Sequence, residues 1–222
     1  MKTKFAVVPM IALLAAASLV FAAAPAATPL PAPKTDGQFA VEKALKERRS
    51  LRAPAQTPLT LEEIGQLCWA AQGVTDAKGH RTASSAMAVY PLELYVIAGA
   101  VEGLAPGIYR YEPAPHALTL VAPGDKRDEF VGKGIGQGWV KKAPAIFVLA
   151  GLPAKMARMK DRGPQFMAIE AGLAAQGFFL QATARGLGST YVGGFDPAAA
   201  RAALGLPATT EVLGVLPVGR KP

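Results

Sequence analysis

The sequence predicts an α+β fold. Helical and strand-like segments are mixed without the regular alternation that a doubly wound parallel sheet requires. The segments 107–111 and 117–121 are expected to pair as an antiparallel hairpin. Neither a GxGxxG dinucleotide fingerprint nor a GxxxxGK[ST] phosphate loop is present. Of the 222 residues, 51% are hydrophobic and 18% are charged, so the chain is expected to be globular, with one substantial core or two small ones.

The first 24 residues indicate a signal peptide, so the protein is expected to be exported to the bacterial periplasm. Two lysines precede an almost wholly apolar run from Phe5 to Val20, and small residues follow the run. Cleavage is expected after Ala22 or Ala24. The alternative is an uncleaved membrane anchor, because the apolar run approaches the roughly 20 residues that span a bilayer.

Residues 25–36 are rich in Ala, Pro and Thr and are predicted to form a flexible leader without a core of its own. One domain, residues 37–222, follows this leader. Its first helix is predicted from Gln38 to Arg48. The inner face of this helix is expected to consist of Phe39, Val41, Ala44 and Leu45.

A second helix is predicted to begin at a capping box formed by Thr60 and Glu63 and to end at Gly73. Its apolar stripe is expected to enter the core. The stripe consists of Leu61, Ile64, Leu67 and Cys68. Because Cys68 is the only cysteine, no internal disulfide can form, and this residue is interpreted as a small buried hydrophobe.

The remaining elements are predicted from hydrophobic periodicity and turn residues. They are a strand over 90–98, the hairpin over 107–111 and 117–121, a helical or irregular stretch over 125–140, a strand over 145–150, a mobile basic stretch over 151–165, a helix over 166–185, a strand over 189–192, a short helix over 197–204 and a strand over 211–218. The helix over 166–185 is apolar nearly all round. We therefore expect it to be buried on several sides, as a central core helix or against a second subunit.

The net charge of +8 favours anionic ligands or surfaces. The basic residues are dispersed and are not interleaved with aromatic residues, so nucleic acid is not an expected partner. The two histidines, His80 and His116, are far apart, and no Cys/His cluster has metal-ligand spacing. Neither a metal site nor a hydrolytic triad is therefore expected.

Three guanidinium groups and one hydroxyl lie within five residues at the end of the first predicted helix. They belong to Arg48, Arg49, Ser50 and Arg52. Arginine side chains bind phosphate oxygens two at a time, and three of them this close repel one another unless an anion lies between them. We interpret this arginine cluster as the binding site for the phosphate end of a cofactor. The alternative is a solvated basic helix end, which the helix dipole also favours.

Several motifs occur in an order that resembles the nitroreductase family of FMN flavoproteins. These motifs are Glu47–Arg52, Thr82–Val96, Gly107–Tyr111, Ala184–Gly188, Gly193–Phe195 and Leu216–Arg220. Together they are most similar to the branch that includes the dehydrogenases that form thiazole and oxazole rings in peptides. The resemblance covers Phe39 to Lys221, nearly all of the chain that follows the predicted leader.

The resemblance implies a small antiparallel sheet wrapped by helices and an intertwined homodimer that binds FMN at the subunit interface. By position, the arginine cluster would hold the phosphate, the ribityl chain and the pyrimidine edge of FMN, and Arg220 would return to the phosphate. Ser85 would contact the flavin from the other subunit. Gly193 and Gly194 would place backbone N–H groups near flavin N5. Without the resemblance, Arg220 is interpreted as part of a solvated terminus, Ser85 as a loop hydroxyl, and Gly193 and Gly194 as a plain turn.

Two residues depart from the family pattern. Met87 replaces a Gly and Ser84 replaces a Pro. The bulk of Met87 is expected to narrow the flavin or substrate face. The chain also shows no partner domain for peptide delivery, so peptide ring oxidation is not expected.

The predicted function is that of an exported FMN-dependent oxidoreductase. Hydride would pass from NAD(P)H or another reduced donor through flavin N5 to an electron-poor acceptor such as a nitroaromatic or a quinone. No side chain is assigned a catalytic role, because the flavin performs the chemistry. The basic stretch over 151–165 is interpreted as a lid over the acceptor site. The alternative function is a flavin-binding or anion-binding module without turnover.

Overall fold

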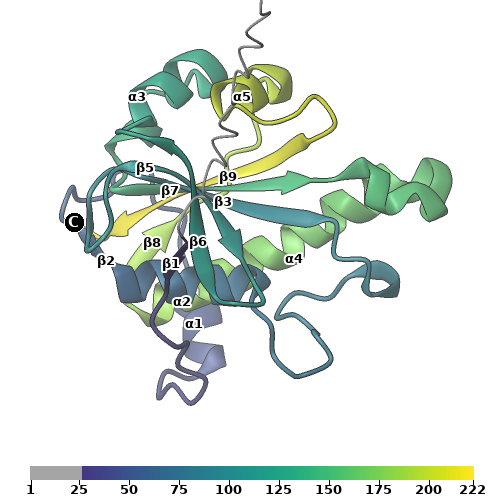
Figure 1. Ribbon diagram of the computed structural model, residues 1–222. Coiled ribbons are helices and arrows are strands. Elements are labelled where there is room, and N and C mark those ends of the chain that lie inside the picture. Colours follow the sequence, from purple (N-terminus) through teal and green to yellow (C-terminus); the bar gives the residue numbers. More distant parts are fainter. Residues whose placement is uncertain (1–26) are drawn as a thin grey trace, which may run out of the picture.

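An antiparallel sheet of seven strands forms the centre of the computed structural model, which describes residues 27–222 (Figure 1). The strands lie in the order β1-β6-β5-β3-β7-β9-β8, and every neighbouring pair is antiparallel. They are β1 (Ala27–Pro29), β3 (Leu92–Ala98), β5 (Gly107–Glu112), β6 (Ala117–Pro123), β7 (Ala145–Gly151), β8 (Leu187–Ser189) and β9 (Glu211–Arg220). A short parallel pair joins β2 (Leu59–Thr60) to β4 (Val101–Glu102). The α+β prediction and the predicted hairpin of β5 and β6 are confirmed.

Helices cover both faces of the sheet, with α2 and α4 on one face and α3 and α5 on the other (Figure 1). The helices are α1 (Val41–Glu47), α2 (Leu61–Gln72), α3 (Arg127–Phe130), α4 (Gly163–Ala184) and α5 (Pro197–Ala203). Short irregular helices are η1 (Ala86–Ala88), η2 (Val131–Ile135), η3 (Val140–Lys142) and η4 (Pro153–Arg162). Successive residues of β3 face opposite sides, so Val96 enters the core under α2 and α4, and Ile97 enters the core under α3 and α5.

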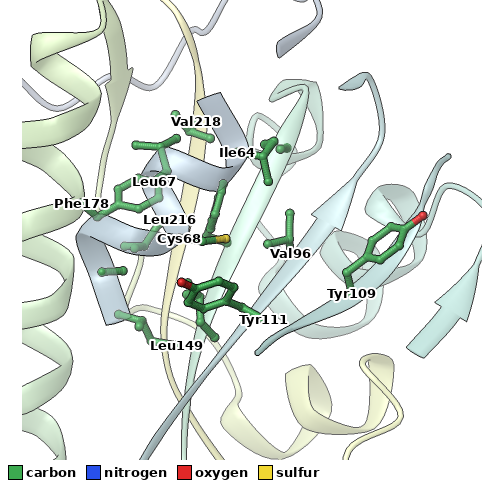
Figure 2. Packing of buried hydrophobic residues seen from close by; sticks show 14 of the residues in the cluster. Ile64, Leu67, Cys68, Val96, Tyr109, Tyr111, Leu149, Phe178, Leu216 and Val218 are labelled. Atoms are coloured by element: carbon green, nitrogen blue, oxygen red, sulfur yellow. The ribbon is translucent and has the colours of Figure 1, made fainter. Parts of the chain in front are cut away.

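Helix α2 forms the centre of the larger core. Its predicted capping box is present: Glu63 N donates to Thr60 Oγ1 at 3.2 Å, and Thr60 N donates to Glu63 Oε2 at 2.9 Å. Figure 2 shows Leu67 and Cys68 packed among strand residues and Phe178 of α4. Cys68 is fully buried, as predicted, and burial raises the pKa of its thiol.

Helix α1 does not bury the face that its sequence predicts. Ala44 is buried, but Val41 and Leu45 are 62% and 54% exposed. The long helix α4 is likewise open on one side, where Ile169 and Leu173 are 50% and 46% exposed. The prediction for α1 is therefore wrong within one chain, where α1 contacts α4 and buries Ala44 alone.

Two segments predicted to be flexible contain regular secondary structure. The signal peptide prediction lies outside the described residues, but from Ala27 the predicted leader pairs with the edge of the sheet as β1. Leu30 N then donates to His116 O at 3.0 Å. The basic stretch predicted to be mobile forms the 3₁₀ helix η4, which Met156 anchors with only 2% of its surface exposed. The boundaries of signal, leader and domain stay predictions.

Candidate functional site

Backbone hydrogen bonds attach the arginine cluster to one edge of the sheet. Leu51 N donates to Ser189 O at the end of β8 at 3.1 Å, and Ala55 N donates to Arg220 O at the end of β9 at 3.0 Å. Two isolated backbone bridges therefore hold residues 50–55 against β8 and β9. The structure in this way brings the arginine cluster and Arg220 together, although they lie at opposite ends of the described chain.

The three guanidinium groups of the cluster differ in their partners. Arg49 Nη1 donates to the carbonyl oxygens of Lys46 and Arg48, at 2.9 and 2.8 Å, and so caps the end of α1. Arg48 is partly buried and Arg52 is exposed, and within residues 27–222 neither side chain forms an ion pair. Since three adjacent cations have no carboxylate partner in that part of the chain, the cluster suits an anionic ligand.

Arg220 has its backbone beside the cluster and its side chain on α2. Arg220 Nη1 lies 3.1 Å from Glu63 Oε1, and Nη2 donates to Glu63 Oε2 at 3.2 Å. Glu63 is also the capping-box residue of α2, so one carboxylate closes the helix and orients Arg220. A phosphate bound at Arg220 would share the Arg220 guanidinium with the Glu63 carboxylate.

The hydroxyl of Ser189 lies at the same edge. It is the one buried side-chain polar atom of the described residues without a hydrogen-bond partner. An unpaired buried hydroxyl is costly. This cost falls where the arginine cluster meets β8, because Ser189 pairs with Ser50.

The two glycines Gly193 and Gly194 follow directly along the chain. Val192 and Val215 exchange backbone hydrogen bonds of 2.8 and 3.1 Å, which fix the start of this turn, and Gly194 O accepts from Gln137 Nε2 at 3.1 Å. No described residue accepts from the N–H of either glycine. A Cβ at Gly193 would approach Tyr191 only to 3.4 Å, and neither glycine has a positive φ. The fold itself therefore does not require glycine at these two positions. A ligand that lies close to the backbone would require it, because glycine has no Cβ in the way.

The arginine cluster and the glycine turn form one line along the sheet edge. Gly193 lies four positions after Ser189, which pairs with Ser50. At about 3.3 Å per residue, the distance from Ser189 to Gly193 is roughly 13 Å. The line has cationic side chains at one end and free N–H groups at the other. It fits an elongated cofactor with a phosphate at one end and a planar ring at the other.

The structure does not bring Ser85 to this line within one chain. Ser85 Oγ accepts from Tyr90 N at 2.8 Å, and the next residue, Ala86, donates its N–H to Glu170 Oε1 at 2.9 Å. Glu170 lies near the start of α4, whereas Arg185 at its end leads into β8. Fifteen helical residues at about 1.5 Å each separate the two positions by roughly 22 Å.

The loop after Ser85 is strained. Met87, Ala88 and Tyr90 have φ values of 54°, 53° and 49°, in the left-handed region that costs a non-glycine residue about 1–2 kcal/mol. Met87 is also 71% exposed. The residue that departs from the family pattern thus occupies a backbone conformation that suits glycine.

Sequence reasoning missed three residues of this region: Glu63 as the partner of Arg220, Gln137 beside Gly194, and Glu170 beneath the Ser85 loop. Glu170 was detectable, because it is the one acidic residue in the apolar helix over 166–185 and such a residue needs a partner when buried. A cavity of about 530 Å³ lies elsewhere, between residues 34–39, α2 and the end of α4. None of the predicted site residues lines it.

Within residues 27–222, no three His, Cys, Asp or Glu side chains are grouped as a metal site would require. In the same part of the chain, no helix has both the length and the apolar character to cross a membrane.

The sequence matches that of known proteins over most of its length. The family model described as the nitroreductase family matches residues 45–220. A protein of Methanocaldococcus jannaschii that is named as a nitroreductase is 35% identical over 185 residues, which are 83% of this chain and 92% of that protein.

Solved structures share the fold. A structure from Ralstonia eutropha that is named as a nitroreductase has a TM-score of 0.75 and 29% identity, over 88% of this chain and 90% of that one. A chain of the Escherichia coli microcin synthetase McbBCD complex has a TM-score of 0.67 and 20% identity, over 86% and 76% of the two chains. The NADPH:FMN oxidoreductase of Vibrio harveyi has a TM-score of 0.58 and 22% identity, over 81% and 68%.

Proposed function

The chain belongs to the nitroreductase family, which consists of FMN-dependent oxidoreductases, and from this premise we propose that it is an exported member. Bound FMN supplies the hydride chemistry, from NAD(P)H or another reduced donor to an electron-poor acceptor such as a nitroaromatic or a quinone. The observation that best supports the proposed site is the pair of backbone hydrogen bonds, Leu51 to Ser189 and Ala55 to Arg220, which align the arginine cluster with the glycine turn.

The arginine cluster would bind the phosphate end. Within residues 27–222 the guanidinium groups of Arg48 and Arg52 form no ion pair, and Arg49 has N–H groups beyond the one that caps α1. Ser50 is exposed beside them and adds a hydroxyl for the phosphate or the ribityl chain. Charge-assisted hydrogen bonds of this kind are roughly twice as strong as neutral ones.

The glycine turn would support the ring. The unbonded N–H groups of Gly193 and Gly194 can donate to flavin N5, and the absence of a Cβ lets the ring lie close to the backbone. Cationic and N–H donors beside the ring stabilise the negative charge of the reduced form, so these groups favour hydride acceptance.

A second copy of the chain would complete the site. Ser85 is too far from the arginine cluster to share one cofactor within a single chain, but an antiparallel partner would bring its own Ser85 loop across. The exposed apolar side chains of α1 and α4 provide the surface for this contact. They are Val41, Leu45, Ile169 and Leu173. Because α1 ends at Arg48, a partner that covers this face lies beside the phosphate end.

Helix η4 would form a basic wall over the acceptor. It includes Lys155, Arg158, Lys160 and Arg162. Lys155 Nζ donates to Tyr90 O at 3.2 Å, which joins η4 to the Ser85 loop. Since that loop would contact the partner's flavin, η4 would lie near the acceptor and favour anionic ones.

The test is an absorbance spectrum of the mature protein, with mass identification of any released cofactor. A yellow protein that bleaches under NADH or NADPH and recovers with a nitroaromatic or a quinone supports the enzyme. Colour without turnover supports the non-catalytic module. A colourless protein whose melting temperature does not respond to added FMN contradicts both. Sequencing the N-terminus of the periplasmic protein tests export.

A further inference from the structure

A second cavity, smaller than the one beside residues 34–39, lies between β3, β5 and the start of η4. It is away from the arginine cluster. Its volume is about 170 Å³, several times the roughly 30 Å³ of one water molecule in the liquid. The charged residues that line it are Arg81, Glu93, Arg110, Glu112 and Lys155. None of these residues belongs to the arginine cluster or the glycine turn, and Lys155 is also part of η4, the proposed wall over the acceptor.

Arg81 has no acidic partner in this cavity. Its Nη1 donates to Gln72 Oε1 at 2.9 Å, and its guanidinium carbon lies 4.8 Å from the centre of the Tyr90 ring. Within residues 27–222 no carboxylate pairs with it. Partial burial lowers the pKa of the Arg81 guanidinium, as expected for a cation removed from water without a counter-ion.

Two other partly buried arginines have carboxylate partners. Arg127 pairs with Asp125 and Arg185 pairs with Glu62, each at 2.6 Å. Arg81 differs from these two in that its side-chain partner is the neutral amide of Gln72. A partly buried guanidinium without a carboxylate partner is costly. An anion from outside the chain that bound in the cavity would offset the cost at Arg81.

The two carboxylates of the cavity are already occupied. Arg110 Nη2 lies 2.8 Å from Glu112 Oε1, and its Nη1 lies 3.8 Å from Glu93 Oε1. Glu93 Oε2 also accepts from Tyr95 Oη at 2.7 Å. Both carboxylates are thus on Arg110, and the five charged residues leave the cavity a net charge of +1. Within residues 27–222, Arg81 and Lys155 form no ion pair.

Lys155 is the second cation without a carboxylate partner among the described residues that line the cavity. Its Nζ donates one hydrogen bond, to Tyr90 O, which leaves two N–H groups for a ligand. Arg81 stacks on the ring of the same tyrosine. Tyr90 thus holds both cations at the cavity, one through its ring and one through its carbonyl oxygen.

We propose that Arg81 and Lys155 form a binding site for a small oxyanion, either a free phosphate or the carboxylate of a small organic acid. The fork of Arg81 would bind two oxygens, and Lys155 would act as a point charge from the other side. The site shares no residue with the arginine cluster or the glycine turn, and binding of the oxyanion is measured independently of turnover.

The test uses the FMN-loaded protein, in which the arginine cluster is occupied. Isothermal titration calorimetry with inorganic phosphate and with acetate, against sodium chloride at equal ionic strength, should show saturable binding of at least one oxyanion. Arg81→Gln should weaken that binding at least tenfold and Lys155→Gln severalfold. Arg158→Gln, which removes a charge from the same helix outside the cavity, should leave the affinity unchanged.

The two probes also identify the ligand class, because stronger binding of phosphate or of acetate indicates which oxyanion the cavity selects. Heat that follows ionic strength alone, or binding that persists in Arg81→Gln, overturns the proposal. If Arg81→Gln fails to fold, Lys155→Gln decides, since Lys155 is exposed and its replacement leaves the core intact. Unchanged oxyanion affinity in that variant likewise overturns the site.

Discussion

The backbone N–H of Leu51 donates to the carbonyl oxygen of Ser189 at 3.1 Å, and this bond joins the arginine cluster to the strand that leads to the glycine turn. Two groups of residues from distant parts of the sequence thereby share one edge of the sheet. The position of the arginines is thus set by backbone pairing, which does not depend on their side chains. Their side chains can therefore be changed without breaking these backbone bonds, although replacing Arg49 also removes the cap of α1.

The double variant Arg48→Ala, Arg49→Ala is expected to lose its flavin and keep its fold. Each charge-assisted hydrogen bond to a phosphate contributes about 1.5–3 kcal/mol, so the dissociation constant of FMN should rise at least a hundredfold. Flavin absorbance per protein measures occupancy, and circular dichroism measures the fold. The control Arg158→Ala, Lys160→Ala removes the same charge from η4 and should retain the flavin. Full occupancy in the first variant would assign the arginines another role.

Met87→Gly should stabilise the protein, because glycine adopts a φ of 54° without the clash that a Cβ causes. The gain in the free energy of unfolding is expected to be about 0.5–1 kcal/mol, after allowing for the greater backbone freedom of glycine in the unfolded chain. Met87→Ala keeps the Cβ and should gain nothing. Urea denaturation of the three proteins measures the difference. Equal stability of the Ala and Gly variants would show that the loop is unstrained.

Ile169→Glu and Leu173→Glu should each prevent dimerisation. Both side chains are about half exposed on α4, and a carboxylate at a buried contact lacks the water and the partner that it needs. We expect the dissociation constant of the dimer to rise at least a hundredfold, as measured by analytical ultracentrifugation. The resulting monomer should lose its flavin. Val121→Glu, at an exposed apolar position on β6, is the matched control. A wild-type monomer that binds flavin would contradict the two-copy site.

The stability of the protein should fall as the pH decreases below about 6.5, the ordinary pKa of histidine, through His116. Burial lowers the pKa of His116. Its Nδ1 lies 2.8 Å from Tyr111 Oη, and its Nε2 lies 3.0 Å from Pro31 O. Because the folded pKa lies below the unfolded value, the unfolded chain binds the proton more readily, and acid favours unfolding until the folded pKa is passed.

The measurement is the melting temperature between pH 7.5 and 5. His116→Gln, which cannot titrate, should lose part of the pH dependence. An identical pH profile for the variant and the wild type would exclude His116 as the cause.

Features that depend on neighbouring residues were predictable from the sequence. The capping box of Thr60 and Glu63, the hairpin of β5 and β6, and the burial of Cys68 are each determined by a few residues and their periodicity, and the structure confirms them. Turn residues and apolar repeats bias the backbone locally, so no knowledge of distant segments was needed.

Only the tertiary structure decided how distant segments meet. The sequence indicated that Arg220 and the arginine cluster act together, but it did not indicate that the Arg220 side chain pairs with Glu63. It assigned Val41 and Leu45 to a buried face that one chain leaves open, and it gave no reason to expect an unpaired Arg81 in a cavity. Burial and ion pairing depend on contacts between residues far apart in sequence, and periodicity within one element cannot specify which partner covers its apolar face.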